Sequence, residues 1–94
     1  MLEVSLHDDI KEIRLARAPV NALNDALIGA LLEQFAPEAL ATARAVVLSG
    51  QRGVFTAGLD LRALTEPGAI DYRAFARRFF TLQQRIASSP VPVI

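Results

Sequence analysis

The 94-residue sequence contains no cysteine and no tryptophan, and its one histidine is His7. Without cysteine, the chain has no disulfide, no thiol nucleophile and no cysteine-ligated zinc. No apolar run approaches the roughly 18 residues of a membrane-spanning helix, and no signal peptide follows Met1. Ten basic residues balance ten acidic ones, so the charge gives no support to a nucleic-acid partner. These absences predict a soluble, cytoplasmic protein without a membrane contact.

The composition is apolar for so short a chain. Hydrophobic residues make up 52% of the sequence, and the mean hydropathy is +0.31. A chain of this length is expected to form one small domain over residues 1–94, which buries only about 60–65% of its unfolded surface. We therefore expect part of its apolar surface to be covered by another subunit or by chain outside these residues.

The N-terminal residues 2–16 alternate between apolar and polar side chains, as a β-hairpin does. Asp8 and Asp9 lie where the hairpin turns. A metal site is the other interpretation of this acidic pair, but no third ligand is placed nearby, and aspartate is a frequent turn residue. The turn is therefore the favoured interpretation.

The rest of the chain alternates helices with strands, which predicts an α/β fold. Further expected elements are a helix from Asn24 or Asp25 to about Phe35, a buried strand in 43–50, a loop from 51 to about 60, a turn or short helix to Leu64, a helix in 71–89 and a strand that begins in 91–94.

The helix in 71–89 has two faces. Its apolar stripe is expected to be core and consists of Tyr72, Phe75, Ala76, Phe79, Phe80, Leu82 and Ile86. Its opposite side is expected to be solvated rather than an anion site and consists of Arg73, Arg77, Arg78, Gln84 and Arg85.

The stretch GVFTAGLDL, residues 53–61, follows the buried strand and holds one charged side chain, Asp60. Gly53 and Gly58 have the glycine spacing of a phosphate-binding loop, but Leu59 and Asp60 stand where such a loop needs lysine and serine or threonine. His7 has no serine or cysteine nucleophile at a recognisable spacing, and no nucleophile elbow occurs. What remains is the main chain, whose amide N–H groups can hold an oxygen on which negative charge develops. This hypothesis is an oxyanion hole made by the loop.

Three stretches, PVNALN (19–24), FTAGLDL (55–61) and SSPVPVI (88–94), together resemble the crotonase superfamily of enoyl-CoA hydratases and isomerases. The resemblance runs from the first hairpin to Ile94 and implies the N-terminal part of a spiral of ββα turns. It implies an acyl-CoA thioester substrate, an enolate intermediate held by two main-chain N–H groups, and assembly as trimers or pairs of trimers. No metal and no cofactor besides the acyl-CoA substrate are implied.

The same resemblance assigns roles to individual residues. Ala57 is expected to supply the first oxyanion N–H, and Gly58, Leu59 and Asp60 are expected to continue the contact with the acyl-CoA. Val20 and Ala22 correspond to the lining of the CoA channel. Asp60 is expected to order the loop or to cap the helix after it rather than to transfer a proton.

Other parts of the family's machinery have no counterpart in residues 1–94. The second N–H donor and the catalytic glutamate or glutamates come later in family members, and none is nominated among Glu3, Glu12, Glu33, Glu38 and Glu66. The sequence is thus interpreted as the N-terminal part of an enoyl-CoA isomerase or hydratase, most similar in its AGLDL motif to Δ3,Δ2-enoyl-CoA isomerases. Alone, it is expected to be inactive or nearly so. The alternative is a catalytically inactive fragment that binds acyl-CoA or supports oligomerisation.

Overall fold

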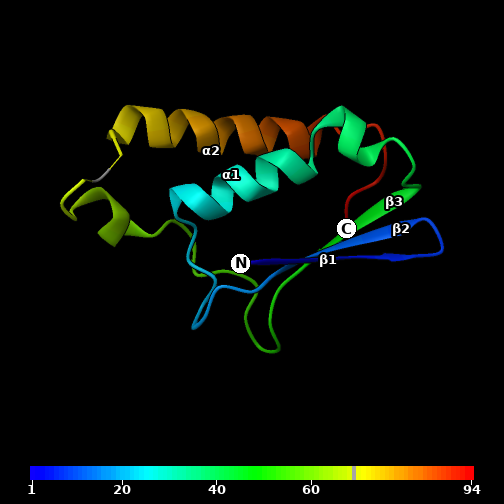
Figure 1. Ribbon diagram of the computed structural model, residues 1–94, viewed down its shortest axis with the longest axis horizontal. Helices are drawn as coiled ribbons and strands as arrows, with labels where there is room; N and C mark the ends of the chain where they lie inside the picture. Colours follow the sequence, from blue (N-terminus) through cyan, green and yellow to red (C-terminus); the bar gives the residue numbers. More distant parts are fainter. Residues whose placement is uncertain (69) are drawn as a thin grey trace.

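A three-stranded sheet carries a layer of helices on one face (Figure 1). This computed structural model describes residues 1–68 and 70–94. The strands are β1 (Leu2–His7), β2 (Ile10–Leu15) and β3 (Ala45–Ser49), in the order β1-β2-β3. The helices are α1 (Asp25–Gln34) and α2 (Tyr72–Ala87), with two short 3₁₀ helices, η1 (Pro37–Leu40) and η2 (Leu61–Leu64). The expected α/β order is confirmed.

The hairpin of β1 and β2 is antiparallel, with Leu2 opposite Leu15 at one end. At the other end the chain turns at Asp8 (φ 49°) and Asp9 (φ 71°). Two successive residues with positive φ are typical of the tight turns that match the twist of a hairpin, and aspartate tolerates this backbone well. The predicted turn is therefore confirmed.

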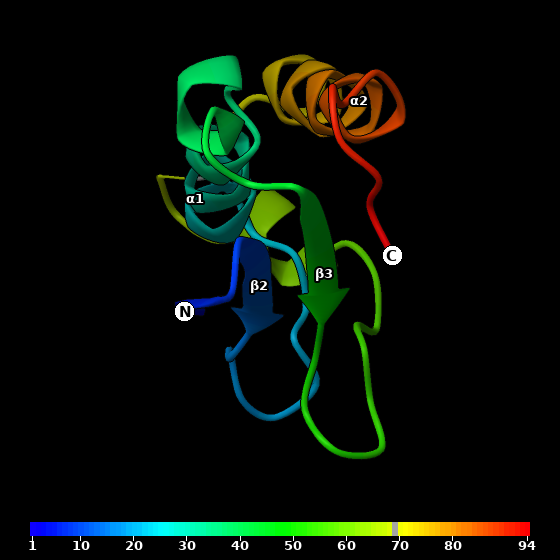
Figure 2. The ribbon, with the colours of Figure 1, turned by 90° about the vertical axis from the view of Figure 1, so that its right-hand side faces the viewer.

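Strand β3 pairs in parallel with β2, and α1 lies on the connection between them. On its other edge, β3 receives the last residues of the chain (Figure 2). Val46 donates its N–H to the Pro92 carbonyl, and Leu48 donates to that of Ile94, both at 2.8 Å. The strand expected to begin in 91–94 is thus present as a parallel bridge between Val46 and Val93.

Helix α1 begins where the sequence predicts, because Asn24 caps it. The Asn24 side chain accepts the N–H of Leu27 at 2.9 Å, which satisfies one of the unpaired donors of the first turn. The apolar stripe of α1 faces the sheet and forms the core together with strand residues. Its buried members are Leu27, Ile28, Leu31 and Leu32.

Lys11 in β2 faces the helices, although a lysine in an alternating strand is expected on the solvent side. Only 8% of it is exposed, and its Nζ donates to the carbonyls of Gln34 (3.3 Å) and Ala39 (3.1 Å). Gln34 is the last residue of α1, so the ammonium lies at the negative end of the helix dipole. Burial lowers the pKa of Lys11 from its ordinary value.

The apolar stripe of α2 is wider than its contact with the core, and one part of the prediction for this helix is wrong. Phe75 and Leu82 are buried, but Tyr72 is 66% and Phe80 is 63% exposed. The side of α2 that rests on α1 and on the core buries its side chains, and the outer part of the stripe stays uncovered. In the part of the chain that the structure describes, no helix combines the length and apolar character needed to cross a membrane.

Two of the α2 arginines also depart from the expectation of a solvated face. Arg78 donates its Nε to Asp25 Oδ1 at 2.7 Å, and Arg85 donates Nη1 to the Leu32 carbonyl at 2.7 Å. Both partners belong to α1. These arginines thus tie the two helices together, and the solvated side of α2 is narrower than the sequence predicts.

Candidate functional site

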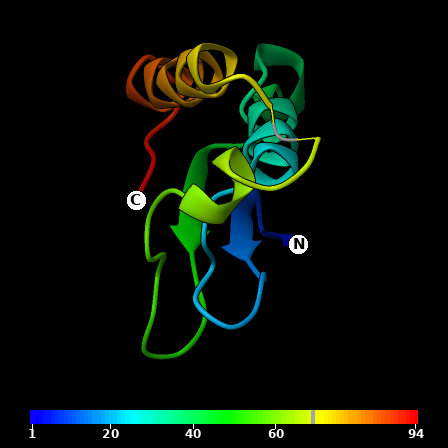
Figure 3. The same cartoon turned by 90° about the vertical axis from the view of Figure 1, so that its left-hand side faces the viewer.

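Two loops meet at the carboxyl ends of the parallel strands β2 and β3 (Figure 3). The first, residues 16–24, follows β2, and the second, residues 50–60, follows β3. Ligands of parallel sheets commonly bind at this edge, outside the carboxyl ends of the strands. The loop suspected from the sequence therefore lies at the edge of the sheet where a binding site is expected.

Asn21 is the hub between the two loops. It is fully buried and has φ 53°, a left-handed backbone that asparagine tolerates better than most residues. Its Oδ1 accepts the N–H of Arg17 at 2.7 Å. Its Nδ2 donates to the carbonyls of Leu15 (3.2 Å) and Phe55 (2.9 Å). One side chain thus connects the end of β2 to the second loop.

Thr56, in the second loop, forms a further hydrogen bond to Asn21. Its hydroxyl donates to the Asn21 carbonyl at 2.6 Å and accepts the N–H of Gly58 at 3.0 Å. The hydroxyl is therefore used as donor and as acceptor at once. It fixes the turn at Gly58, whose φ of +93° favours glycine.

Asp60 is buried and is held by arginines on both sides. Arg17 Nη1 donates to its Oδ2 at 3.0 Å and also to the Ala22 carbonyl at 2.7 Å. The N–H of Arg62 donates to Oδ1 at 3.1 Å, so Asp60 caps η2 as expected. Burial alone raises the pKa of Asp60, but the hydrogen bonds and charges of Arg17 and Arg62 outweigh it and lower the pKa from its ordinary value of 3.8.

The expectation that Ala57 offers a free N–H is corrected by the structure. Its N–H donates to the Val20 carbonyl at 2.9 Å. The reason is the close pairing of the two loops, which uses this amide to hold them together. The next amide, of Gly58, is taken by Thr56, and that of Asp60 donates to the Leu23 carbonyl at 2.9 Å.

Leu59 has the remaining amide of the segment 57–60, and its direction follows from the peptide bond before it. The Gly58 carbonyl accepts the N–H of Leu23 at 2.8 Å. In a planar trans peptide the C=O and the N–H point in opposite directions, so the Leu59 N–H points away from Leu23. It has no hydrogen-bond partner within residues 1–68 and 70–94. Sequence reasoning named Leu59 as a contact but not as the donor.

All six residues named from the sequence lie at this junction. Val20 contacts Ala57 through the hydrogen bond above, and Ala22 shares Arg17 with Asp60. Leu23 and Leu59 form a parallel bridge. In a bridged segment successive peptide groups point alternately toward and away from the partner segment, and this alternation is the signal that would have identified Leu59 as the free donor.

A cavity of about 260 Å³ lies between the second loop and the core. Phe55, Thr56 and Gly58 contribute to its wall from the loop, and the other lining residues are almost all apolar and include Leu23, Leu48, Phe79 and Leu82. Neither Ala57 nor Leu59 lines it, so the cavity and the unpaired amide are separate features. Within the described ranges no group of three or more metal-ligating side chains occurs.

Comparison with known proteins identifies one family whose model matches this chain. The family model described as enoyl-CoA hydratase/isomerase matches residues 6–94. Among curated protein sequences, none matches the chain.

Solved structures share the fold over nearly the whole chain. The enoyl-CoA hydratase from Mycobacterium smegmatis is 32% identical, with a TM-score of 0.85 over 98% of this chain and 37% of its own. The enoyl-CoA hydratase/isomerase from Xanthobacter autotrophicus Py2 is 27% identical, with a TM-score of 0.85 over 98% and 36%. A family protein from Silicibacter pomeroyi is 27% identical, with a TM-score of 0.79 over 99% and 41%. The expected crotonase-like α/β fold is confirmed, and the chain spans about two fifths of the length of these structures.

Replacing Asn21 tests the hub. Asn21→Ala is expected to lower the free energy of unfolding by about 2–4 kcal/mol, because it removes the donor to the carbonyls of Leu15 (a buried bond) and Phe55 (a half-buried bond) and places alanine at a positive φ. Asn21→Gly, the matched control, relieves the backbone strain and is expected to be about 1 kcal/mol less destabilised than the alanine variant. Chemical denaturation measures both, and an alanine variant as stable as the parent would contradict the assigned role.

The lowered pKa of Asp60 predicts an acid-sensitive fold. A carboxylate whose pKa is lower in the native state stabilises the protein above the unfolded value of 3.8, and this stabilisation is lost as the pH falls through the native value. As the pH is lowered from above 3.8 to below it, the free energy of unfolding is expected to fall more steeply for the parent than for Asp60→Asn, because the asparagine side chain cannot titrate. Parallel pH profiles for the two proteins would show that Arg17 and Arg62 do not hold the carboxylate.

Proposed function

The chain belongs to the enoyl-CoA hydratase/isomerase family, and on this premise we propose that its paired loops bind the thioester of a fatty enoyl-CoA in an isomerase or hydratase. The observation that carries the proposal is the Leu59 N–H. It has no partner in the described residues, and it is aimed outward by the Leu23–Gly58 hydrogen bond. We therefore assign the oxyanion donor to Leu59 in place of Ala57.

The environment of Leu59 supports this assignment. The carbonyl of its peptide unit already accepts a hydrogen bond, which polarises the unit and makes the N–H a stronger donor. The donor needs no rearrangement, because both neighbouring amides are fixed by Thr56 and by Leu23. A single preorganised donor is worth roughly 3–4 kcal/mol in the transition state of reactions that pass through an oxyanion.

No general base is assigned in this loop. Asp60 is the one acid in residues 53–61, and its pKa is lowered by Arg17 and Arg62. A carboxylate held in this way accepts protons poorly, so it suits loop order and not proton abstraction. We propose that residues 1–94 turn over enoyl-CoA little by themselves, and that the base and a second donor decide between isomerase and hydratase.

The remaining contacts of the substrate follow the same two loops. Val20 is 39% exposed and Ala22 is half-buried, and both lie beside the segment 57–60, so we propose that they line the path of the CoA moiety. Assembly as a trimer or hexamer and a cytoplasmic location stay predictions. The alternative of a purely binding or oligomerising fragment is not proposed, because no observation favours it.

An amide-resolved titration tests the donor. Adding butyryl-CoA to the isotopically labelled chain is expected to shift the NMR signal of the Leu59 N–H strongly, because that proton gains a thioester oxygen as partner. The Ala57 N–H is the internal control and is expected to move little, since it keeps the Val20 carbonyl. A larger shift at Ala57 than at Leu59 would return the role to Ala57, and no shift at either would oppose a thioester site in these loops.

A further inference from the structure

Strand β1 has one open edge. Within residues 1–68 and 70–94 it pairs with β2 alone, because the order of the sheet is β1-β2-β3 and no bridge outside the named strands involves β1. Proteins commonly protect such an edge with proline, lysine or a bulge. The strand, LEVSLH, contains neither proline nor lysine, and its pairing with β2 is continuous. Its unpaired N–H and C=O groups are therefore open to a further strand.

The hydrogen bonds of the hairpin determine which main-chain groups face the open edge. The Ala16 N–H donates to the Met1 carbonyl at 2.7 Å, so these two residues belong to a hydrogen-bonded pair. Such pairs alternate with non-hydrogen-bonded pairs along an antiparallel ladder, so every second residue of β1 from Glu3 onward directs its N–H and C=O to β2. The other residues direct theirs to the open edge, namely Leu2, Val4 and Leu6.

The side chains of Val4 and Leu6 form an apolar surface along this edge. Their cross-strand neighbours in β2 are Ile13 and Lys11, which are buried under the helices, so Val4 and Leu6 lie on that same face of the sheet. Unlike these neighbours, Val4 is 46% and Leu6 is 61% exposed. A strand added at the edge would bury both side chains and would also pair the outward main-chain groups.

The sequence of β1 complements a second copy of itself in one antiparallel register. With a two-fold axis at Ser5, Val4 of one copy lies opposite Leu6 of the other, and both residues have outward main-chain groups. The same register places Glu3 opposite His7 of the second copy, so that a carboxylate meets an imidazole N–H. A register centred on Glu3 would oppose two carboxylates, and one centred on Val4 would separate Glu3 from His7.

His7 has a ring nitrogen to spare for this contact. Its Nε2 lies 3.0 Å from the Ser5 hydroxyl and 3.5 Å from a carboxylate oxygen of Glu12. Its Nδ1 forms no hydrogen bond within residues 1–68 and 70–94, and Glu3 forms no ion pair in that part of the chain. Both groups are thus available to the opposite residue of a second copy.

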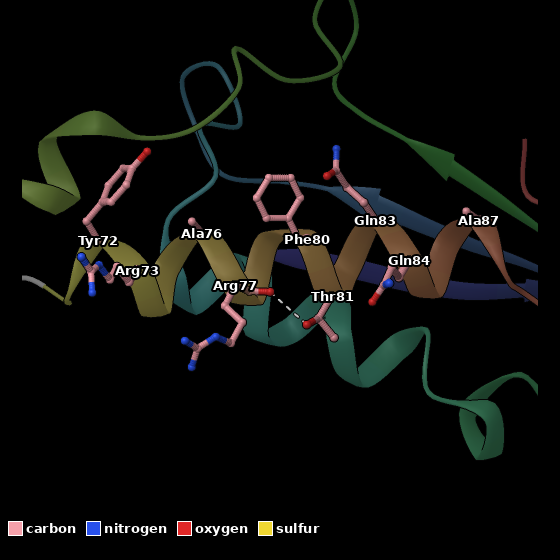
Figure 4. A pocket seen from close by; sticks show the side chains of 9 residues that line it. All are labelled: Tyr72, Arg73, Ala76, Arg77, Phe80, Thr81, Gln83, Gln84 and Ala87. Atoms are coloured by element: carbon pink, nitrogen blue, oxygen red, sulfur yellow. Dashed lines mark hydrogen bonds between the residues drawn. The ribbon is translucent and has the colours of Figure 1, made fainter.

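The outer face of α2 is also exposed and apolar, but it fits a second copy less well (Figure 4). Tyr72 and Phe80 are mostly exposed there. Figure 4 shows Arg73 and Arg77 on the same helix beside them. Because α2 contains four arginines and no acidic residue, two copies packed through this face would bring like charges together. Self-association is therefore expected at β1 and not at α2.

We propose that β1 pairs with β1 of a second copy of this chain, antiparallel and centred on Ser5, so that the two sheets join into one. A contact of identical surfaces about a two-fold axis joins two copies and not three, so the species formed is a dimer. Strand β1 contributes no residue to the two loops at 16–24 and 50–60, so the inference does not rest on the proposed thioester chemistry.

Disulfide cross-linking tests the register, because the chain has no cysteine of its own. At the two-fold axis the two copies of residue 5 form a non-hydrogen-bonded pair with Cα atoms about 4.5 Å apart, which a disulfide can span. In Glu3→Cys the two cysteines lie about 13 Å apart along the strands, beyond that reach. Ser5→Cys is therefore expected to form a covalent dimer under mild oxidation about tenfold faster, or more, than Glu3→Cys. A mixture of Glu3→Cys and His7→Cys is expected to cross-link as Ser5→Cys does.

Sedimentation velocity measures the dimer of the unmodified 10.2 kDa chain. Leu6→Lys is expected to raise its dissociation constant by about tenfold or more, because a lysine on an edge strand opposes pairing. Phe80→Lys is the matched control, since Phe80 is 63% and Leu6 is 61% exposed, and it is expected to leave the dissociation constant unchanged. The proposal is overturned by a chain that stays monomeric at high micromolar concentration, by equal effects of the two lysine variants, or by cross-linking of Glu3→Cys or Phe80→Cys as fast as that of Ser5→Cys.

Discussion

The main chain of Leu23 determines the geometry of the loop pair. Its N–H holds the Gly58 carbonyl and its carbonyl holds the Asp60 N–H, at 2.8 and 2.9 Å. Between these two bonds the Leu59 N–H has one direction open to it, away from the first loop. The position of Leu23 depends in turn on the start of α1, which Asn24 caps. A local helix signal thereby fixes the direction of an amide in a loop that is distant in the sequence.

Buried and half-buried polar groups keep the two loops in this register. Asn21, Thr56 and Asp60 place hydrogen-bonding side chains between loops that apolar residues alone would hold less specifically. Asn21 pairs with carbonyls, Thr56 with a carbonyl and an amide, and Asp60 with arginines. Such a network costs stability if one member is lost, because its partners stay buried without donors or acceptors. The polar side chains between the loops thus fix the arrangement of the main-chain amides, and each of them needs its partners in place.

Local patterns in the sequence predicted the hairpin, α1 and the last bridge at Val93, because each rests on short-range signals of periodicity, capping or turn chemistry. The side of α2 that stays uncovered could not be predicted, since burial of Tyr72 and Phe80 depends on which neighbours the helix has. Likewise, the sequence located the amide-bearing loop, but the choice between Ala57 and Leu59 depends on hydrogen bonds to a distant loop. A motif identifies the segment, and the tertiary pairing decides which N–H is free.

The central claim is that Ala57 is bonded within the protein and Leu59 is not. Scalar couplings across hydrogen bonds, measured by NMR between an amide nitrogen and the carbonyl carbon that accepts it, test this without any ligand. We predict couplings from Leu23 to Gly58 and from Ala57 to Val20, and none from Leu59 to any carbonyl. A coupling that starts at Leu59, or its absence at Ala57, would contradict the account.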